Sequence, residues 1–417
     1  MVGAIGGLSA FGLRAVWYET RVDVFESAML RYLAFVGIIY VSACARSVTS
    51  PRAVPAVNPN PPTEPTPAAR PLQVDAARVY LQTLGERGYS GVAVAAQGNA
   101  VVLEYATGTS DCAGNRPVQV GDVFLIGSIT KVFTQAAMIK LADDGAASLN
   151  DPLARWLPSA PADKKNITLR QLIKHEAGLA DILDDRGQPI QYTVDWDYIP
   201  VSRRQIEERV LASPLQFSPG AKRRYSNAGY SLLAAVIERV SATPYEHYVH
   251  DQLFAPAGMA TTGYVIPDWS QRTLVEGCLG SGQRWGNPIT DGRWMTDGPS
   301  WNLRGNGGML GTAADLVRWL QAIRDSRFFS PNGKASFLTL AVGKSRTFQM
   351  QASAAAGGNG IFNAMYLWLV DSDIMVVMMS NRQGQRAEDH IIEFTEILTG
   401  RAGAGHPTRS GANLVTR

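Results

Sequence analysis

The stretch "FLIGSITKVF", residues 124–133, places Ser128 after a short apolar run and Lys131 three positions later. Residues at i and i+3 share one face of a helix, so the two side chains are expected to lie one turn apart. At a helix N-terminus, unpaired N–H groups and the helix dipole favour the negative charge of an alkoxide or an oxyanion. A lysine buried behind this position has a lowered pKa and can act as a neutral base. The S-x-x-K spacing therefore indicates a nucleophile with its activator.

The same spacing also fits a structural interpretation, in which Ser128 is the N-cap of an ordinary helix and Lys131 lies on its surface. Among the eight lysines of the chain, only Lys131 has a serine three positions before it. A second motif, Tyr225-Ser226-Asn227, is the only Y-x-N in the chain. A tyrosine hydroxyl can serve as a general base when a neighbouring cation stabilises the phenolate. The structural alternative is a packed tyrosine before a helix, with Asn227 near the cap.

The two motifs and their order resemble the serine β-lactamase and penicillin-binding-protein superfamily. Within it, the chain is most similar to class C β-lactamases and to related esterases and D-amino-acid peptidases. The resemblance covers about residues 75–400, because "SGVAVAAQGNAVVLEYATG", "LRQLIKHEAGLAD" and "NGGMLGTAADLVRWLQAI" are also similar to family segments. It implies an α+β fold with α/β layers, of the β-lactamase/transpeptidase type. In that fold a mostly antiparallel sheet flanked by helices lies beside an α-helical subdomain, with the site between them.

The resemblance also implies roles for individual residues. Ser128 would be the acylated nucleophile, Lys131 its activator and Tyr225 the general base. Asn227 would contact both the substrate and the lysine. The backbone N–H of Ser128 would form one half of the oxyanion hole.

A third family motif, Lys-Thr-Gly or His-x-Gly on a strand beside the site, is altered in this chain. The segment "SAAAGGNGIFNAM" takes its place. Aligned on Phe362-Asn363, Ala355 stands where the family has lysine or histidine. Gly357 and Gly358 would still let the substrate approach the backbone, and the N–H of Gly358 would complete the oxyanion hole. Because the missing cation helps the family to bind a substrate carboxylate, arginines in "WNLRGNGG" or "AKRRYSN" are candidate replacements.

These features predict a serine hydrolase that acts through an acyl-enzyme on an ester or amide, whether a small molecule or a peptide. Ala355 favours esterase or amidase activity over true β-lactamase or D-Ala-D-Ala carboxypeptidase activity. A non-catalytic binding protein that keeps the penicillin-recognising fold is the rival from another class. Neither a metal nor an organic cofactor is required. The net charge of +3 is too small to indicate a nucleic-acid surface and no Lys/Arg run stands out, so no nucleic-acid partner is expected.

The cysteines and His175 are further candidates for chemical or structural roles. No C-x-x-C or Cys/His cluster indicates zinc. If Cys44 is lipidated, Cys112 and Cys278 remain as a possible disulfide in an oxidising compartment. His175 would suit a Ser-His-Asp site, but the chain has no G-x-S-x-G elbow, so we interpret it as a structural residue in a loop.

The N-terminal residues predict export rather than a place in the fold. Residues 32–43, "YLAFVGIIYVSA", form an apolar run that is too short to span a bilayer and typical of a signal peptide. "VSAC" resembles the lipobox of bacterial lipoproteins, so Cys44 is expected to be lipidated and to anchor the protein in the cell envelope or periplasm. Acidic residues before Met29 make that methionine the candidate true start. The alternative is an N-terminal helix with a buried cysteine.

The rest of the chain divides by composition. Residues 1–44 are expected to be the export segment, and 45–71 a proline-rich tether with eight prolines in 51–71. Residues 72–400 are expected to form the hydrolase domain, with a mostly helical insert at about 150–304, and 401–417 a tail. Local patterns predict a helix after residue 74, a hairpin around Gln97-Gly98-Asn99, a helix from Ser128, a helical stretch over 229–254, two strands around Asp371-Ser372-Asp373 and a helix over about 386–398.

Overall fold

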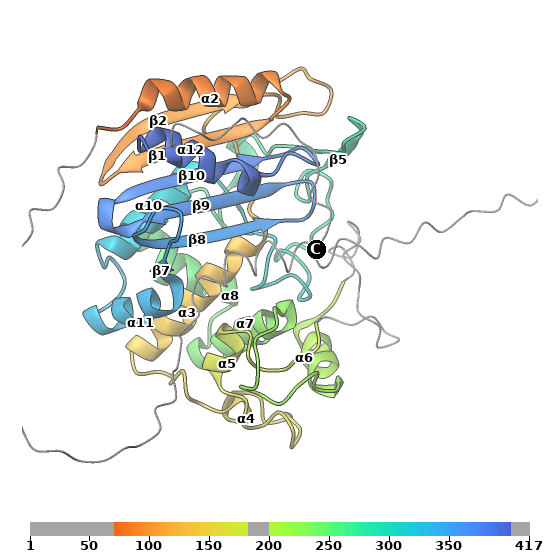
Figure 1. Cartoon of the computed structure of the whole chain (residues 1–417). Helices are drawn as coiled ribbons and strands as arrows, with labels where there is room; N and C mark the ends of the chain where they lie inside the picture. The colour runs from red at the N-terminus through yellow and green to blue at the C-terminus, as the bar shows by residue number, and fades with distance from the viewer. Residues whose placement is uncertain (1–70, 182–199, 402–417) are drawn as a thin grey trace, which may run out of the picture.

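The centre of the molecule is a six-stranded antiparallel sheet in the order β2-β1-β10-β9-β8-β7 (Figure 1). The computed structural model describes residues 71–181 and 200–401. The strands of the sheet are β1 Gly91–Gln97, β2 Ala100–Thr107, β7 Gly343–Lys344, β8 Gln351–Gly358, β9 Asn363–Leu369 and β10 Ile374–Ser380. Because β1 pairs with β10, the two ends of the described chain build one sheet.

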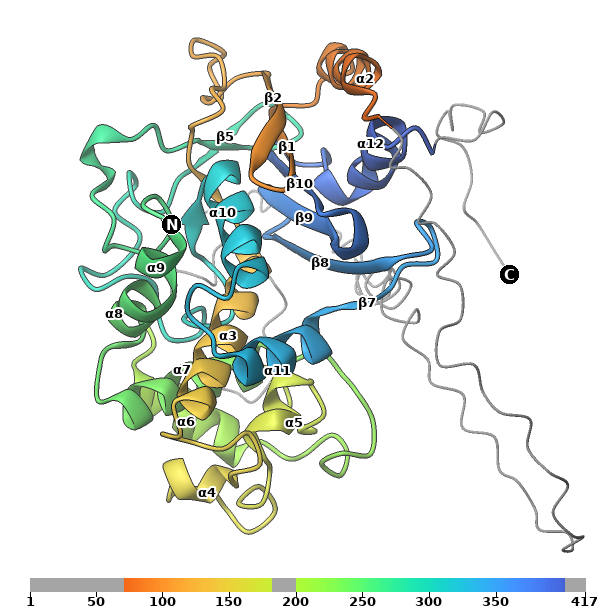
Figure 2. The same cartoon turned by 90° about the vertical axis from the view of Figure 1, so that its left-hand side faces the viewer.

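Helices cover both faces of this sheet, as Figure 2 shows for α10 and α12 on opposite sides. Helices α2 (Val74–Glu86) and α12 (Ile391–Leu398) pack on one face, and α10 (Ala313–Arg324) packs on the other. Strands β9 and β10 are buried at every residue, in agreement with their near-continuous apolar sequences "NAMYLWL" and "IMVVMMS". The prediction of a mostly antiparallel sheet flanked by helices is therefore confirmed.

The local predictions near the sheet are largely confirmed. The chain turns at Gly98 and Asn99 between β1 and β2, and it turns at residues 370–373 between β9 and β10. The helix expected from Ser128 begins instead at Thr130, because Gly127–Ile129 form a 3₁₀ turn before it. Likewise α12 is preceded by a separate 3₁₀ turn at Ala387–Asp389.

A helical region lies beside the sheet and α10. Its helices are α3 Thr130–Asp143, α4 Leu153–Trp156, α5 Leu169–Ile173, α6 Arg203–Ala212, α7 Asn227–Ser241, α8 Tyr245–Val249, α9 Ala255–Ala257 and α11 Pro331–Ala341. Helix α7 is buried from Asn227 through Ile237 and contacts α3, α5, α6 and α8, so it forms the centre of this region. The helical stretch expected over 229–254 is divided at Ala242, which has φ 53°, and Pro244.

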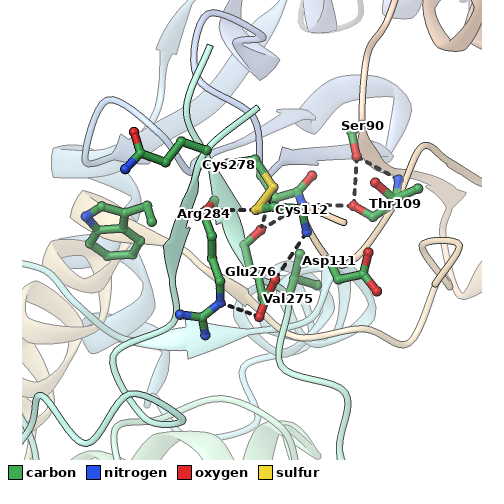
Figure 3. Close-up of a disulfide and its surroundings, with 12 residues drawn as sticks. Ser90, Thr109, Asp111, Cys112, Val275, Glu276, Cys278 and Arg284 are labelled. Atoms are coloured by element: carbon green, nitrogen blue, oxygen red, sulfur yellow. Dashed lines mark hydrogen bonds and ion pairs between the residues drawn. A yellow bond between two sulfur atoms is a disulfide. The ribbon is translucent and has the colours of Figure 1, made fainter. Parts of the chain in front are cut away.

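The predicted disulfide is confirmed. Cys112 and Cys278 are bonded, with 5.5 Å between their Cα atoms (Figure 3). The bond joins the loop after β2 to strand β4 (Gly277–Cys278), which pairs with β5 (Arg284–Gly286). The carboxylate of Glu276 reinforces the junction, because it accepts hydrogen bonds from Cys112 N at 3.1 Å and Arg284 Nε at 2.6 Å.

We expect the Cys112→Ser, Cys278→Ser double variant to lose about 2–5 kcal/mol of unfolding free energy, measured by urea denaturation. The bond closes a loop across a sequence separation of 166 residues, so its loss greatly increases the freedom of the unfolded chain. A reductant should destabilise the wild type by a similar amount and leave the double variant unchanged. Equal stability of the two proteins without reductant would contradict this expectation.

The export prediction falls outside the structure. Cys44, the proline-rich tether and the tail after residue 401 lie outside the described residues. Within the two described ranges, no helix is both long enough and apolar enough to cross a membrane.

Candidate active site

Ser128 lies in the 3₁₀ turn that joins β3 (Phe124–Leu125) to α3. Its side chain is half-buried, and the turn is held by Thr130 Oγ1, which donates to Gly127 O at 2.8 Å. Gly127 adopts φ 51°, a left-handed conformation that favours glycine. The serine is therefore presented at the start of the helix by a turn that its neighbours fix.

Lys131 lies one turn further along α3 and is buried. Its Nζ donates to Ser128 Oγ at 3.0 Å and to the backbone oxygen of Asn306. Burial lowers the pKa of this lysine to about 7, although the negative charge of Asp181 opposes the effect. The amine is therefore largely available in its neutral form at slightly alkaline pH.

Tyr225 completes a cluster of three groups around the serine. Its hydroxyl lies 2.8 Å from Ser128 Oγ, and Lys131 Nζ lies 4.8 Å from the centre of its ring. Burial raises the pKa of the phenol above its usual value, although the hydrogen bond with Ser128 acts in the opposite direction. The structure thus brings the predicted Ser128, Lys131 and Tyr225 within hydrogen-bonding reach, across a sequence separation of 97 residues.

Asn227 is the first residue of α7, but its contacts differ from the expected ones. Its backbone N–H donates to Asp181 Oδ1 at 3.0 Å, and its amide Nδ2 contacts Asp181 Oδ2 at 3.4 Å. Within the described residues, the hydrogen bonds of Lys131 go to Ser128 and Asn306. Among the described residues, Asn227 and Lys131 therefore form no hydrogen bond with each other, and the Nδ2 end of the amide meets the carboxylate of Asp181.

The ring of His175 packs against the ring of Tyr225. It lies in a turn after α5 with φ 59°, and its Nδ1 accepts a hydrogen bond from Ser226 N at 3.1 Å. Its ring centre lies 4.7 Å from that of Tyr225 and 5.0 Å from that of Tyr230. Burial and nearby cationic groups lower its pKa well below the usual value, so the ring is neutral. This placement agrees with the interpretation of His175 as a structural loop residue.

Strand β8 lies directly against the serine turn. A Cβ added to Gly357 would lie 2.2 Å from Ile126 O and 2.4 Å from Ser128 N. A Cβ on Gly127 would lie 2.2 Å from Gly358 N. Only glycines permit this approach of two backbones, which places the backbone nitrogens of Ser128 and Gly358 at one junction, where the resemblance leads us to expect an oxyanion hole.

The third-motif position also faces this region. Ala355 and Gly357 are two residues apart on β8 and therefore share a face of the strand. Ala355 is partly buried and packs with the core that contains α3, whereas Ala356 packs with the core beneath α2 and α12. Arg304 is a candidate replacement for the missing cation, but it is buried and donates to the backbone oxygens of Asp297 and Pro299. Its guanidinium therefore has a structural role.

Two features of the site were not predicted. Asn306 contributes a backbone oxygen, which leaves no signature in a sequence. Asp181 contributes a carboxylate from a loop 46 residues before Asn227. Asp181 ends the segment "LRQLIKHEAGLAD", which is similar to a family segment, but nothing in the sequence distinguishes this aspartate as a site residue.

A serine between a buried lysine and a tyrosine, beside two backbone N–H groups, can attack a carbonyl carbon and stabilise the resulting oxyanion. The fold and this arrangement define the protein as a serine hydrolase of the β-lactamase-related class.

Comparison with known proteins identifies the family. Residues 76–396 match the family described as Beta-lactamase. The chain is 28% identical over 280 residues to penicillin-binding protein 4* of Bacillus subtilis, covering 62% of this chain and 58% of that protein. It is 29% identical to the D-alanyl-D-alanine-carboxypeptidase/endopeptidase AmpH of Escherichia coli, covering 74% of this chain and 73% of that protein. It is also 29% identical to esterase EstB of Burkholderia gladioli, covering 61% of this chain and 70% of that protein.

A solved structure shows the same fold. The octameric penicillin-binding protein homologue from Pyrococcus abyssi superposes with a TM-score of 0.65 at 19% identity, covering 78% of this chain and 77% of that one. The chain belongs to the Beta-lactamase family.

Proposed function

We propose that the protein hydrolyses an ester or amide through an acyl-enzyme formed on Ser128. The observation that carries this proposal is the position of Ser128 Oγ, which lies 3.0 Å from Lys131 Nζ and 2.8 Å from the Tyr225 hydroxyl. A serine that merely capped a helix would not need a buried lysine and a partly buried tyrosine at this distance. The full set also weighs against a non-catalytic binding protein.

The charges of the free site favour Lys131 as the group that takes the proton of Ser128. Its pKa of about 7 makes the neutral amine abundant, whereas the raised pKa of Tyr225 keeps the phenol protonated. The resemblance assigns the general base to Tyr225, whose hydroxyl is close enough to relay the proton. In either case Oγ attacks the carbonyl carbon, and the N–H groups of Ser128 and Gly358 hold the oxyanion.

The second half of the reaction needs the same groups. When the tetrahedral intermediate collapses, the bond to the leaving group breaks and that group takes the proton from Lys131, directly or through Tyr225. Water then attacks the acyl-enzyme and gives its proton to the same pair. The acid is released and Ser128 regains its proton, so no metal or organic cofactor enters either step.

We propose esterase or amidase activity on a small molecule or peptide, in preference to true β-lactamase or carboxypeptidase activity. Ala355 supports this choice, because a methyl group at the third-motif position cannot pair with a substrate carboxylate. Relatives of the chain include a protein named as an esterase and one named as a carboxypeptidase, so the tests below use a neutral ester and a penicillin.

The test is intact-protein mass spectrometry after treatment with a fluorophosphonate or a penicillin, followed by peptide mapping. We expect one fluorophosphonate adduct on Ser128, together with turnover of a neutral p-nitrophenyl ester. If the wild type takes no label and turns over no ester, the binding-protein alternative replaces this proposal.

Restoring the missing cation tests the substrate class. We expect Ala355→Lys to increase acylation by penicillins more than it increases turnover of neutral esters, because an ammonium there can pair with the penicillin carboxylate. Ala354→Lys is the matched control, since Ala354 is exposed and lies on the opposite face of β8. If both variants stay folded and behave alike, the alignment of the third motif is incorrect.

We also propose that the protein is exported and held in the cell envelope by a lipid on Cys44. The apolar run that ends in "VSAC", followed by the proline-rich tether, supports export. The disulfide between Cys112 and Cys278 agrees with an oxidising compartment. Metabolic labelling with a fatty-acid probe tests the anchor, and an unmodified Cys44 in the host would overturn it.

A further inference from the structure

The loop between α5 and Asp181 is fastened to the segment that leads into α7. The backbone oxygens of His175, Glu176 and Gly178 accept hydrogen bonds from Arg224, Gly220 and Gln216, at 2.9, 2.8 and 2.8 Å. Gly178 has φ 74°, and a Cβ there would lie 2.1 Å from Phe217 O. The loop is therefore held in one place, and with it the residue at its end, Asp181.

The carboxylate of Asp181 makes three contacts with the start of α7. Oδ1 accepts from Asn227 N at 3.0 Å and from Ala228 N at 3.4 Å, and Oδ2 contacts Asn227 Nδ2 at 3.4 Å. The helix already has a side-chain cap, because Ser226 Oγ accepts from Gly229 N. Helix capping can explain the two contacts with backbone N–H groups, but it does not explain the contact with the side-chain amide of Asn227.

That contact fixes the orientation of Asn227. An ionised carboxylate accepts hydrogen bonds and cannot donate them, so it selects the Nδ2 end of the amide. The Oδ1 end consequently points away from Asp181. The amide of Asn227, which follows Tyr225-Ser226 in the sequence, is thereby held in one of its two possible orientations.

Asp181 is also the negative group whose charge acts on Lys131. Among the described residues, Tyr225 and Tyr230 lie against the lysine and Asp181 acts on it by its charge. His175 and Arg223 act on the same cluster, His175 by packing on both tyrosine rings and Arg223 by its charge on Tyr225. Burial keeps both phenols protonated and His175 uncharged. Asp181 therefore provides the anion that stabilises the ammonium formed when Lys131 accepts a proton.

We propose that Asp181 is a positioning residue for acylation, which orients the Asn227 amide and stabilises protonated Lys131 by its charge. The inference rests on the proposed acyl-enzyme function. It assigns to Asp181 an effect on the protonation of Lys131, which a residue that only stabilised the fold would not have.

The test is the pH dependence of Ser128 phosphonylation by a fluorophosphonate, followed by intact mass. In the wild type the rate should rise with pH through a midpoint near the Lys131 pKa of about 7. Asp181→Asn removes the charge, so the Lys131 pKa should fall and the midpoint should move to lower pH by roughly one unit. The plateau rate should fall as well, because an amide at 181 no longer selects the Nδ2 end of Asn227.

Two further variants separate charge from folding. Asp181→Glu keeps the charge, so its midpoint should stay near that of the wild type even if the plateau falls. Asp143→Asn is the matched control, because Asp143 accepts from Ser330 N at 2.8 Å at the far end of α3. It should leave both midpoint and plateau unchanged. If Asp181→Asn does not fold, Asp181→Ser removes the same charge with a smaller side chain and should show the same shift.

The outcomes are distinguishable. A folded, uncharged variant at position 181 with the wild-type midpoint would overturn the role of Asp181, whatever its plateau rate. A wild type that takes no label on Ser128 at any pH would instead contradict the proposed acyl-enzyme function.

Discussion

Replacing Lys131 by methionine is expected to slow acylation of Ser128 by about 10²–10⁴-fold, the usual contribution of a positioned general base. Methionine keeps an unbranched, apolar chain in the buried space of the lysine but cannot accept the serine proton. Lys131 Nζ lies 3.0 Å from Ser128 Oγ and is held by the backbone oxygen of Asn306, so water is poorly placed to substitute. The measurement is the rate of fluorophosphonate labelling and of ester turnover.

Lys140→Met provides the matched control on the same helix. Lys140 pairs with Asp144 at the C-terminal end of α3, so its replacement should change the stability slightly and the rate not at all. Ser128→Ala should abolish labelling and turnover. The Ser128→Ala, Lys131→Met double variant should be no worse, because the two groups act as one unit. A Lys131→Met protein that acylates at the wild-type rate would contradict the assignment of the base.

The sequence predicts the reacting side chains of the site better than the groups that hold them in position. Each motif alone also fits a structural role, but Ser128, Lys131 and Tyr225 stand in two motifs whose combination and order resemble those of one family, so the convergence of these groups could be expected. The amide partner of Asn227 could not, because Asp181 is one of many loop carboxylates and its meeting with α7 depends on tertiary packing. Backbone acceptors such as Asn306 O have no side-chain signature at all.

The fold, too, can be predicted from the sequence only in part. The strands β9 and β10 follow from long apolar runs, and the Cys112–Cys278 bond from the count of remaining cysteines. Helix α3 starts at Thr130, two residues later than the sequence predicts, because Ser128 and Ile129 are compatible with an α-helix. The 3₁₀ turn lies where β8 approaches Gly127, a contact between segments more than 200 residues apart in sequence. Helix propensity is a local quantity and does not include such a contact.

This close approach leads to the second large effect, at Gly357. A Cβ at this position would lie 2.2 Å from Ile126 O, 2.4 Å from Ser128 N and 2.7 Å from Ile129 N. All three are backbone atoms, so no side-chain rotation relieves the overlap. In Gly357→Ala, either β8 or the serine turn must move, and either movement separates the N–H of Ser128 from that of Gly358.

We expect Gly357→Ala to reduce kcat for ester hydrolysis by about 10²–10³-fold, the usual cost of losing one oxyanion donor. Gly121→Ala is the matched control, because the same methyl group there meets no atom within 4 Å and the backbone is not left-handed. Thermal denaturation of both variants separates a displaced strand from an unfolded protein. A folded Gly357→Ala enzyme with wild-type kcat would show that the N–H of Gly358 does not hold the oxyanion. The donor opposite Ser128 would then have to come from elsewhere in the site.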